Sequence, residues 1–192
     1  ENSKQLELNL HNNPSHLEAA NAVCLGYSYA LQEYKTKNQV VPVIMHGDSA
    51  FAGQGSVAEC LNLAYLEGYN VGGTIHIIMN NKVGFTASEP ESSSVYSTNL
   101  AKSIDAPIIH VQADNLDDVL KAINLAYEYR QKFNKDIFID LIGFRKYGHN
   151  EGDDPEFTNP VMYKDIAKKD SLYKQFKDYA VKNDLTTWQT CK

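Results

Sequence analysis

The sequence predicts an α/β fold, a doubly wound and mostly parallel sheet with helices on both faces. Short apolar runs rich in Val and Ile alternate with longer amphipathic runs, which is typical of buried parallel strands joined by helices. The chain has 192 residues, of which 43% are hydrophobic and 22% charged, so it can bury a core without disulfides or a metal. We expect a main domain over residues 1–160 and a helical extension or linker over residues 161–192.

The first predicted helix begins near Ser15. Ser15 and Glu18 have the spacing of a capping box, and apolar residues then recur every three or four positions as far as Leu31. The next run, residues 40–45, is apolar and predicts a strand buried on both faces. Proline cannot donate to a sheet, so Pro42 should lie near the start of that strand.

The remaining elements continue the alternation of apolar and amphipathic runs. Glycine, serine, asparagine and proline mark the loops between them. Strands are expected over 74–79, 107–111 and 136–144, helices over about 55–66, 116–127 and 161–183, and polar loops over 82–97 and 147–160.

Composition argues against several classes of protein. The net charge is −6 and no dense basic cluster occurs, so binding to nucleic acid or to an anionic membrane surface is not expected. No apolar run approaches the roughly 20 residues that span a bilayer. The three cysteines, Cys24, Cys60 and Cys191, are too scattered for a zinc site or disulfide framework and indicate a reducing compartment. Because the first residue is not Met, we expect a piece of a longer chain.

Unusual polar residues follow three of the predicted strands. His46-Gly47-Asp48-Ser49-Ala50 follows the first, Asn80-Asn81-Lys82-Val83-Gly84-Phe85 the second, and residues 145–154 the fourth. Ligands of open parallel sheets bind at the carboxyl ends of the strands, where these residues should lie.

Two of these segments together indicate a magnesium site. Asp48 offers a carboxylate, Asn81 an amide oxygen and Val83 a backbone carbonyl, and Mg²⁺ prefers such oxygen ligands completed by phosphate and water. The start of the helix after Gly53 offers N–H groups for a phosphate. Either segment alone would more often be an ordinary turn. Their occurrence on successive strands favours the site.

Five segments resemble, in the right order, the diphosphate-binding domain of thiamine-diphosphate-dependent 2-oxoglutarate dehydrogenases, the decarboxylating first component of that complex. The chain departs from that family at Ser49, where Ala is usual, and at Lys82, where Gln is usual. The loop at residues 91–97 is one residue shorter and lacks the usual Arg and Cys. The resembling segments are residues 13–19, 46–55, 72–77, 80–86 and 147–155.

The resemblance implies the thiamine-diphosphate-binding fold, with thiamine diphosphate and Mg²⁺ as cofactors. It implies that Asp48, Asn81 and the Val83 carbonyl hold the metal against the diphosphate. His149 would lie at the diphosphate or active site, and His16 would contact the 2-oxo acid, which makes both catalytic candidates. The implied cofactor-binding residues are Gly47, Asp48, Ser49, Asn81, Val83 and His149.

Each histidine also has a structural interpretation. His149 could be a surface residue, and His16 a surface residue at a helix end. His46 could close the end of its strand or line a pocket, and His76 is better explained as a hydrogen-bonded core residue.

The implied activity is oxidative decarboxylation of 2-oxoglutarate in the tricarboxylic acid cycle, with succinyl transfer to a lipoyl group on the second component. The resemblance further implies a homodimer, in the cytoplasm of a bacterium or the mitochondrial matrix of a eukaryote. The chain alone should be inactive, because family members activate the cofactor with a glutamate from a second domain. The alternatives are a 2-oxoadipate dehydrogenase first component, a non-catalytic scaffold of the same fold, or an unrelated phosphate-binding enzyme.

Overall fold

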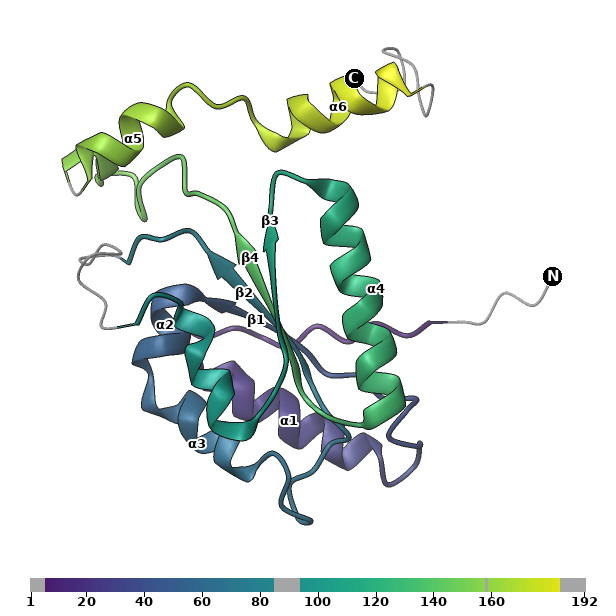
Figure 1. The fold of residues 1–192 in the computed structure, drawn as a ribbon. Helices are drawn as coiled ribbons and strands as arrows, with labels where there is room; N and C mark the ends of the chain where they lie inside the picture. Colours follow the sequence, from purple (N-terminus) through teal and green to yellow (C-terminus); the bar gives the residue numbers. More distant parts are fainter. Residues whose placement is uncertain (1–5, 85–93, 158, 184–192) are drawn as a thin grey trace.

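The computed structural model describes residues 6–84, 94–157 and 159–183, and it contains the predicted parallel sheet (Figure 1). All strand pairs are parallel and the strand order is β1-β2-β4-β3. The carboxyl ends of the strands therefore meet at one edge of the sheet, as the sequence predicted. The strands are β1 (Val43–Gly47), β2 (Ile75–Asn80), β3 (Ile108–Gln112) and β4 (Ile137–Ile142).

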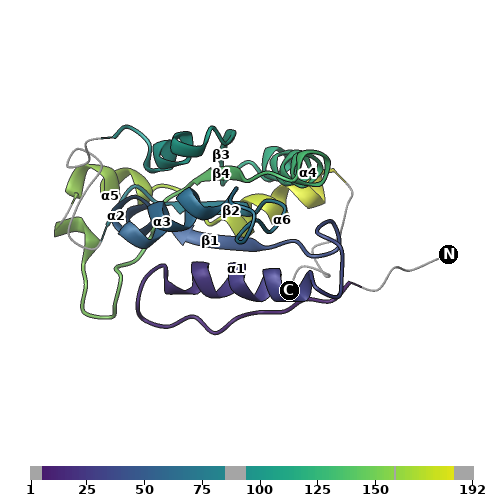
Figure 2. The ribbon, with the colours of Figure 1, turned by 90° about the horizontal axis from the view of Figure 1, so that it is seen from below.

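Helices cover both faces of the sheet, which confirms the doubly wound class (Figure 2). On one face an apolar cluster joins Phe51 and Val57 to Phe138 of β4. On the other face Ala122 and Ala126 pack against the sheet. The first face carries α1 (Ala19–Leu31), α2 (Asp48–Gly53), α3 (Gly55–Leu63) and the 3-10 helix η2 (Ser97–Ile104), and the second carries α4 (Leu116–Phe133).

Strand β1 is buried on one face, so the prediction that both faces are buried was wrong. Ile44 is 7% exposed, whereas Val43 and Met45 are 50% and 65% exposed. The reason is that β1 is an edge strand and α4 packs mainly over β3 and β4. The strand begins directly after Pro42, as expected, and the Pro42 carbonyl accepts a bond from the Ile75 N–H at 3.1 Å.

Helix α1 begins at Ala19, and the predicted capping box is absent. Glu18 precedes the helix in the left-handed region, with φ of 69°, and no side chain caps the helix start. The Glu18 carboxylate contacts His46 Nδ1 instead, at 2.6 Å. His46, which is distant in sequence, thus binds the Glu18 side chain that the local spacing had predicted to cap the helix.

Short helical segments depart from the prediction in the loops and at the end of the chain. The sequence did not predict α2 or η2, and the expected helix over 161–183 is two helices, capped by Asn159 and Ser171. Much of the predicted loop over 82–97 lies outside the described residues. The further segments are the 3-10 helix η3 (Pro155–Phe157), α5 (Pro160–Ile166) and α6 (Leu172–Lys182).

Helix α5 packs on the carboxyl edge of the sheet. Tyr163 and Ile166 form a small buried cluster with Val83, the residue predicted to offer a carbonyl to the metal. The predicted domain boundary between residues 160 and 161 stays a prediction.

The fully buried side chain of Arg130 binds backbone carbonyls at the end of the sheet opposite the carboxyl ends of the strands. Arg130 of α4 donates from Nε to the Gly73 carbonyl at 3.0 Å, and from Nη2 to the carbonyls of Val40 and Val71 at 2.9 and 3.1 Å. These carbonyls belong to the segments that lead into β1 and β2, so one side chain fixes the approach to both strands.

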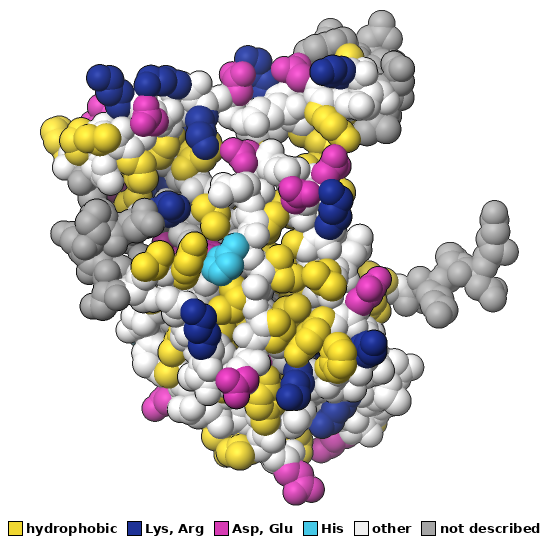
Figure 3. Space-filling model, in the orientation of Figure 1, with side chains coloured by type: hydrophobic (Ala, Val, Ile, Leu, Met, Phe, Trp, Pro, Cys, Tyr) yellow, Lys and Arg dark blue, Asp and Glu magenta, His cyan; other side chains and the backbone are white. Residues whose placement is uncertain are grey.

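Hydrophobic side chains are exposed along α4 (Figure 3). Leu120, Ile123 and Tyr127 are between 42% and 53% exposed. None of the helices within the described residues is long and apolar enough to cross a membrane.

Candidate functional site

Asp48 is the first residue of α2 and directly follows β1. Its side chain is buried, and backbone N–H groups of Ser49, Asn81 and Lys82 point at its carboxyl group. Burial raises the pKa of Asp48, and those N–H groups oppose the shift only in part. The environment therefore disfavours the carboxylate in the absence of a cation, and a cation at this position would favour it.

The residues after β2 form a tight turn beside Asp48. Asn80 Oδ1 accepts the Lys82 N–H at 3.2 Å, and Asn81 Oδ1 accepts the Val83 N–H at 3.0 Å. Lys82 lies between them in the left-handed region, with φ of 62°. Two successive asparagine side chains thus close the turn, a role that suits their short amide groups.

The oxygen groups in this turn fit a magnesium ion better than an all-protein metal cage. Within the described ranges, no group of three or more His, Cys, Asp or Glu side chains could hold a metal. Mg²⁺ commonly uses one or two carboxylates and completes its shell with phosphate and water. Asp48, the Asn81 amide oxygen and the Val83 carbonyl supply that kind of donor set.

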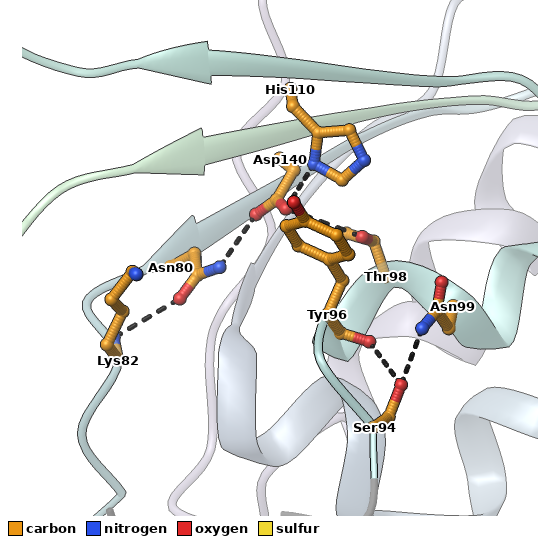
Figure 4. A network of polar contacts seen from close by, with 8 residues as sticks. All are labelled: Asn80, Lys82, Ser94, Tyr96, Thr98, Asn99, His110 and Asp140. Carbon is orange, nitrogen blue, oxygen red and sulfur yellow. Dashed lines mark hydrogen bonds and ion pairs between the residues drawn. The ribbon is translucent and has the colours of Figure 1, made fainter. Parts of the chain in front are cut away.

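Asp140 lies behind the turn, inside the sheet (Figure 4). It is fully buried on β4 and accepts bonds from Asn80 Nδ2 at 2.9 Å, His110 Nδ1 at 2.7 Å and Thr98 Oγ1 at 3.4 Å. Sequence reasoning missed this residue. The available signal was a carboxylate within an otherwise apolar strand, because a buried charge needs partners.

A second buried chain of side chains joins α1 to the sheet. His46 is bonded on both ring nitrogens, through Nδ1 to Glu18 and through Nε2 to His76 Nδ1 at 2.9 Å. His76 Nε2 lies 3.7 Å from Asp136, and burial lowers the pKa of His76 against the opposing effect of that carboxylate. The prediction of His76 as a hydrogen-bonded core residue is confirmed. Glu18 as the partner of His46 was missed.

The two histidines proposed for catalysis lie in different settings. His149 follows β4 in a loop, is half-buried, and donates its backbone N–H to Asp153 Oδ2 at 2.9 Å. His16 is exposed in the bend before α1. Their catalytic roles stay predictions. The cofactor-binding roles of Gly47, at the end of β1, and of Ser49, in α2, also stay predictions, and both residues are exposed.

A cavity of about 410 Å³ opens at the carboxyl ends of β2, β3 and β4. Asn81 lines it, whereas Asp48, His149 and His16 are not among its described lining residues. Arg145, Lys169 and Asp114 also line it, and Lys169 Nζ lies 3.6 Å from Asp114 Oδ2.

The sequence matches the family described as dehydrogenase E1 component over residues 1–192. This chain belongs to that family. The match confirms the resemblance drawn from five short segments, and the parallel sheet with its flanking helices agrees with it.

Curated bacterial members of the dehydrogenase E1 family are similar over nearly the whole chain. The 2-oxoglutarate dehydrogenase E1 component of Bacillus pumilus is 45% identical over 97% of this chain and 21% of its own length. The protein of the same name from Geobacillus kaustophilus is 47% identical, over 95% of this chain and 20% of its own. The protein of the same name from Rickettsia prowazekii is 44% identical, over 95% of this chain and 20% of its own length. The chain therefore spans about one fifth of the length of these relatives.

Proposed function

We propose that this chain forms the diphosphate- and magnesium-binding part of a thiamine-diphosphate-dependent 2-oxoglutarate dehydrogenase first component. The observation that supports it most is the meeting of Asp48 with the turn Asn80–Val83 at the carboxyl edge of the sheet. Neither the buried carboxylate nor the paired asparagines are needed to pack a sheet. Both are accounted for by a cation that binds a diphosphate.

In this proposal the chain binds and orients the cofactor. Asp48 supplies the negative charge to Mg²⁺, and Asn81 and Val83 supply neutral oxygens, with Gly47 and Ser49 beside them. His149 contacts the diphosphate and His16 the 2-oxo acid. Thiamine diphosphate, when bound, supplies the electron sink that allows carbon dioxide to leave a 2-oxo acid.

The proposed substrate is 2-oxoglutarate, and the succinyl group passes to a lipoyl group on a second component of the complex. The names of the similar bacterial proteins support this substrate. We also propose that the full-length protein is a homodimer. Rates of decarboxylation of 2-oxoglutarate and 2-oxoadipate, compared as kcat/KM, test the substrate: a higher value for 2-oxoadipate would overturn this part of the proposal.

Calorimetric titration with thiamine diphosphate and Mg²⁺ tests the cofactor site on the full-length protein. Loss of an outer-shell partner commonly weakens metal binding by about 10- to 100-fold, so removal of a ligand by Asp48→Ala should weaken it by at least about 100-fold. Asp178→Ala, which alters an exposed carboxylate on α6, is the matched control and should bind like the wild type. If the wild type and Asp48→Ala bind alike, or neither binds, the turn is structural and a scaffold role replaces this proposal.

A further inference from the structure

Asp140 is a buried carboxylate that neither the sheet nor the proposed chemistry explains. Its neighbours along β4 are Ile139 and Leu141, and an apolar side chain would fill the position at lower cost. The described contacts of its carboxyl group are with the side chains of Asn80, Thr98 and His110. Burying a carboxylate in this way costs stability, which indicates that the residue has a use other than packing.

The strand register brings Asp140 next to the turn Asn80–Val83, which holds the proposed metal ligands. Asp140 is paired with Ile78 on β2 and with His110 on β3. Alternate residues of a strand point to the same face, so Asn80 lies on the same face as Ile78, one step nearer the carboxyl end. Asp140 therefore lies between His110 and Asn80 and contacts both side chains (Figure 4).

The bond to Asp140 decides which way the Asn80 amide points. A carboxylate only accepts hydrogen bonds, so the amide must turn its nitrogen toward Asp140. Its oxygen then points away and accepts the Lys82 N–H. That bond helps hold Lys82 in the left-handed conformation that the turn requires.

His110 and Thr98 hold the other carboxylate oxygen. His110 Nδ1 and Thr98 Oγ1 both contact Oδ2, which leaves Oδ1 to Asn80. The Tyr96 ring packs on the His110 ring with centroids 4.4 Å apart, so the imidazole is itself held in place. The contacts thus form a chain that leads from the half-exposed His110 through Asp140 and Asn80 to the turn.

We propose that Asp140, held by His110 and Thr98, is a positioning residue that fixes the Asn80 amide and thereby the turn that presents Asn81 and Val83 to the metal. This inference rests on the proposed function, because it needs a metal bound at that turn. Asp140 touches neither metal nor substrate and acts through Asn80.

Calorimetric titration of the full-length protein with thiamine diphosphate and Mg²⁺ also tests this inference. Asn80→Ala should weaken binding by about 10- to 100-fold, the usual effect of losing an outer-shell partner. His110→Ala should weaken it by about tenfold, and His110→Asn should restore most of the loss, because the asparagine amide nitrogen can take the place of Nδ1. Asp136→Asn is the matched control: it neutralises another buried carboxylate, next to β4 at the opposite edge, and should leave binding unchanged.

A double-mutant cycle separates positioning from general destabilisation. If Asp140 acts through Asn80, Asp140→Asn should weaken binding in the wild type but add little to Asn80→Ala. Additive losses, or equal binding by Asn80→Ala and the wild type while Asp48→Ala loses binding, would overturn this inference and leave the proposed function standing. A wild type that does not bind the cofactor and metal would overturn both.

Discussion

At the scale of residues, three buried charged groups are stabilised in different ways. The Asp140 carboxylate is surrounded by hydrogen-bond donors, and Arg130 is bonded to backbone carbonyls. Among the described residues, the N–H groups of its own turn and the neighbouring turn favour the Asp48 carboxylate, but burial outweighs them and raises its pKa. Within the described residues, Asp48 is therefore the one of these three whose charge is least compensated, which agrees with its proposed role as a cation ligand.

Asp48→Asn should stabilise the cofactor-free protein at neutral pH. With its pKa raised in the folded state, Asp48 adds stability that is complete below the ordinary aspartate pKa and is lost as pH rises through the raised value. At pH 7 the wild type has lost that contribution, whereas asparagine has no charge to desolvate. Urea unfolding at pH 4 and pH 7, without Mg²⁺, should show an advantage for the variant that grows with pH.

The control for this prediction is Asp178→Asn, which removes an exposed charge. Because this variant keeps Asp48, the difference between its stability and that of the wild type should change little between the two pH values. Equal pH dependence in Asp48→Asn and the wild type would mean that the pKa of Asp48 is not raised in the protein.

Arg130→Met should destabilise the protein by about 3 kcal/mol, the upper part of the range for leaving buried polar groups unsatisfied. Methionine can fill part of the volume, but it leaves the carbonyls of Val40, Val71 and Gly73 without their donor. Urea unfolding measures the loss. Lys132→Ala, on an exposed position of the same helix, should change the free energy of unfolding by less than about 0.5 kcal/mol. Similar losses in the two variants would contradict this role of Arg130.

Sequence reasoning could predict the juxtaposition of Asp48 with Asn81 because both follow apolar strands. In a parallel sheet, that position alone brings them to one edge. It could not predict the bond between Glu18 and His46 or the contacts of Asp140. Those depend on strand order and register, which place residues 28 to 60 positions apart in contact.

At the scale of elements, apolar runs predicted every strand to within a few residues, since burial in a parallel sheet imposes a strong pattern. The exposure of β1 was not predictable, because an apolar run does not tell an edge strand from a central one. Helix α2 was missed since six residues are too few to show a helical period. The capping box failed because the Glu18 carboxylate contacts His46 instead.

Helix α5 should support the turn Asn80–Val83, which holds the proposed metal ligands, through its buried face. Ile166→Ala removes a side chain that packs with Val83, and buried Ile→Ala changes typically cost about 2–5 kcal/mol. We expect lower stability together with weaker binding of thiamine diphosphate and Mg²⁺. Calorimetry and urea unfolding measure the two effects.

Val161→Ala, at a 76% exposed position on α5, is the matched control and should alter neither quantity. If Ile166→Ala loses stability but binds the cofactor as the wild type does, α5 supports the fold without supporting the turn.

At the scale of the whole molecule, the described residues form one sheet and leave apolar surfaces open. Val43 and Met45 on β1 and the outer side chains of α4 are exposed. Exposed apolar groups on this scale commonly mark contact surfaces. The chain also spans only about one fifth of the length of its bacterial relatives. Further protein packed on these exposed apolar side chains would bury them.

The isolated chain should therefore not decarboxylate 2-oxoglutarate, even with thiamine diphosphate and Mg²⁺ present. The family resemblance implies that a glutamate from a second domain activates the aminopyrimidine of the cofactor, whereas the proposed role of this chain is to bind the diphosphate. A chain that positions the cofactor without activating it should catalyse the reaction only slowly, because binding energy accelerates a reaction only where it favours the transition state. Release of carbon dioxide from labelled 2-oxoglutarate measures the activity, with the full-length protein as positive control. Turnover by the chain alone, at a rate lost in Asp48→Ala, would show that these 192 residues contain the activating group as well.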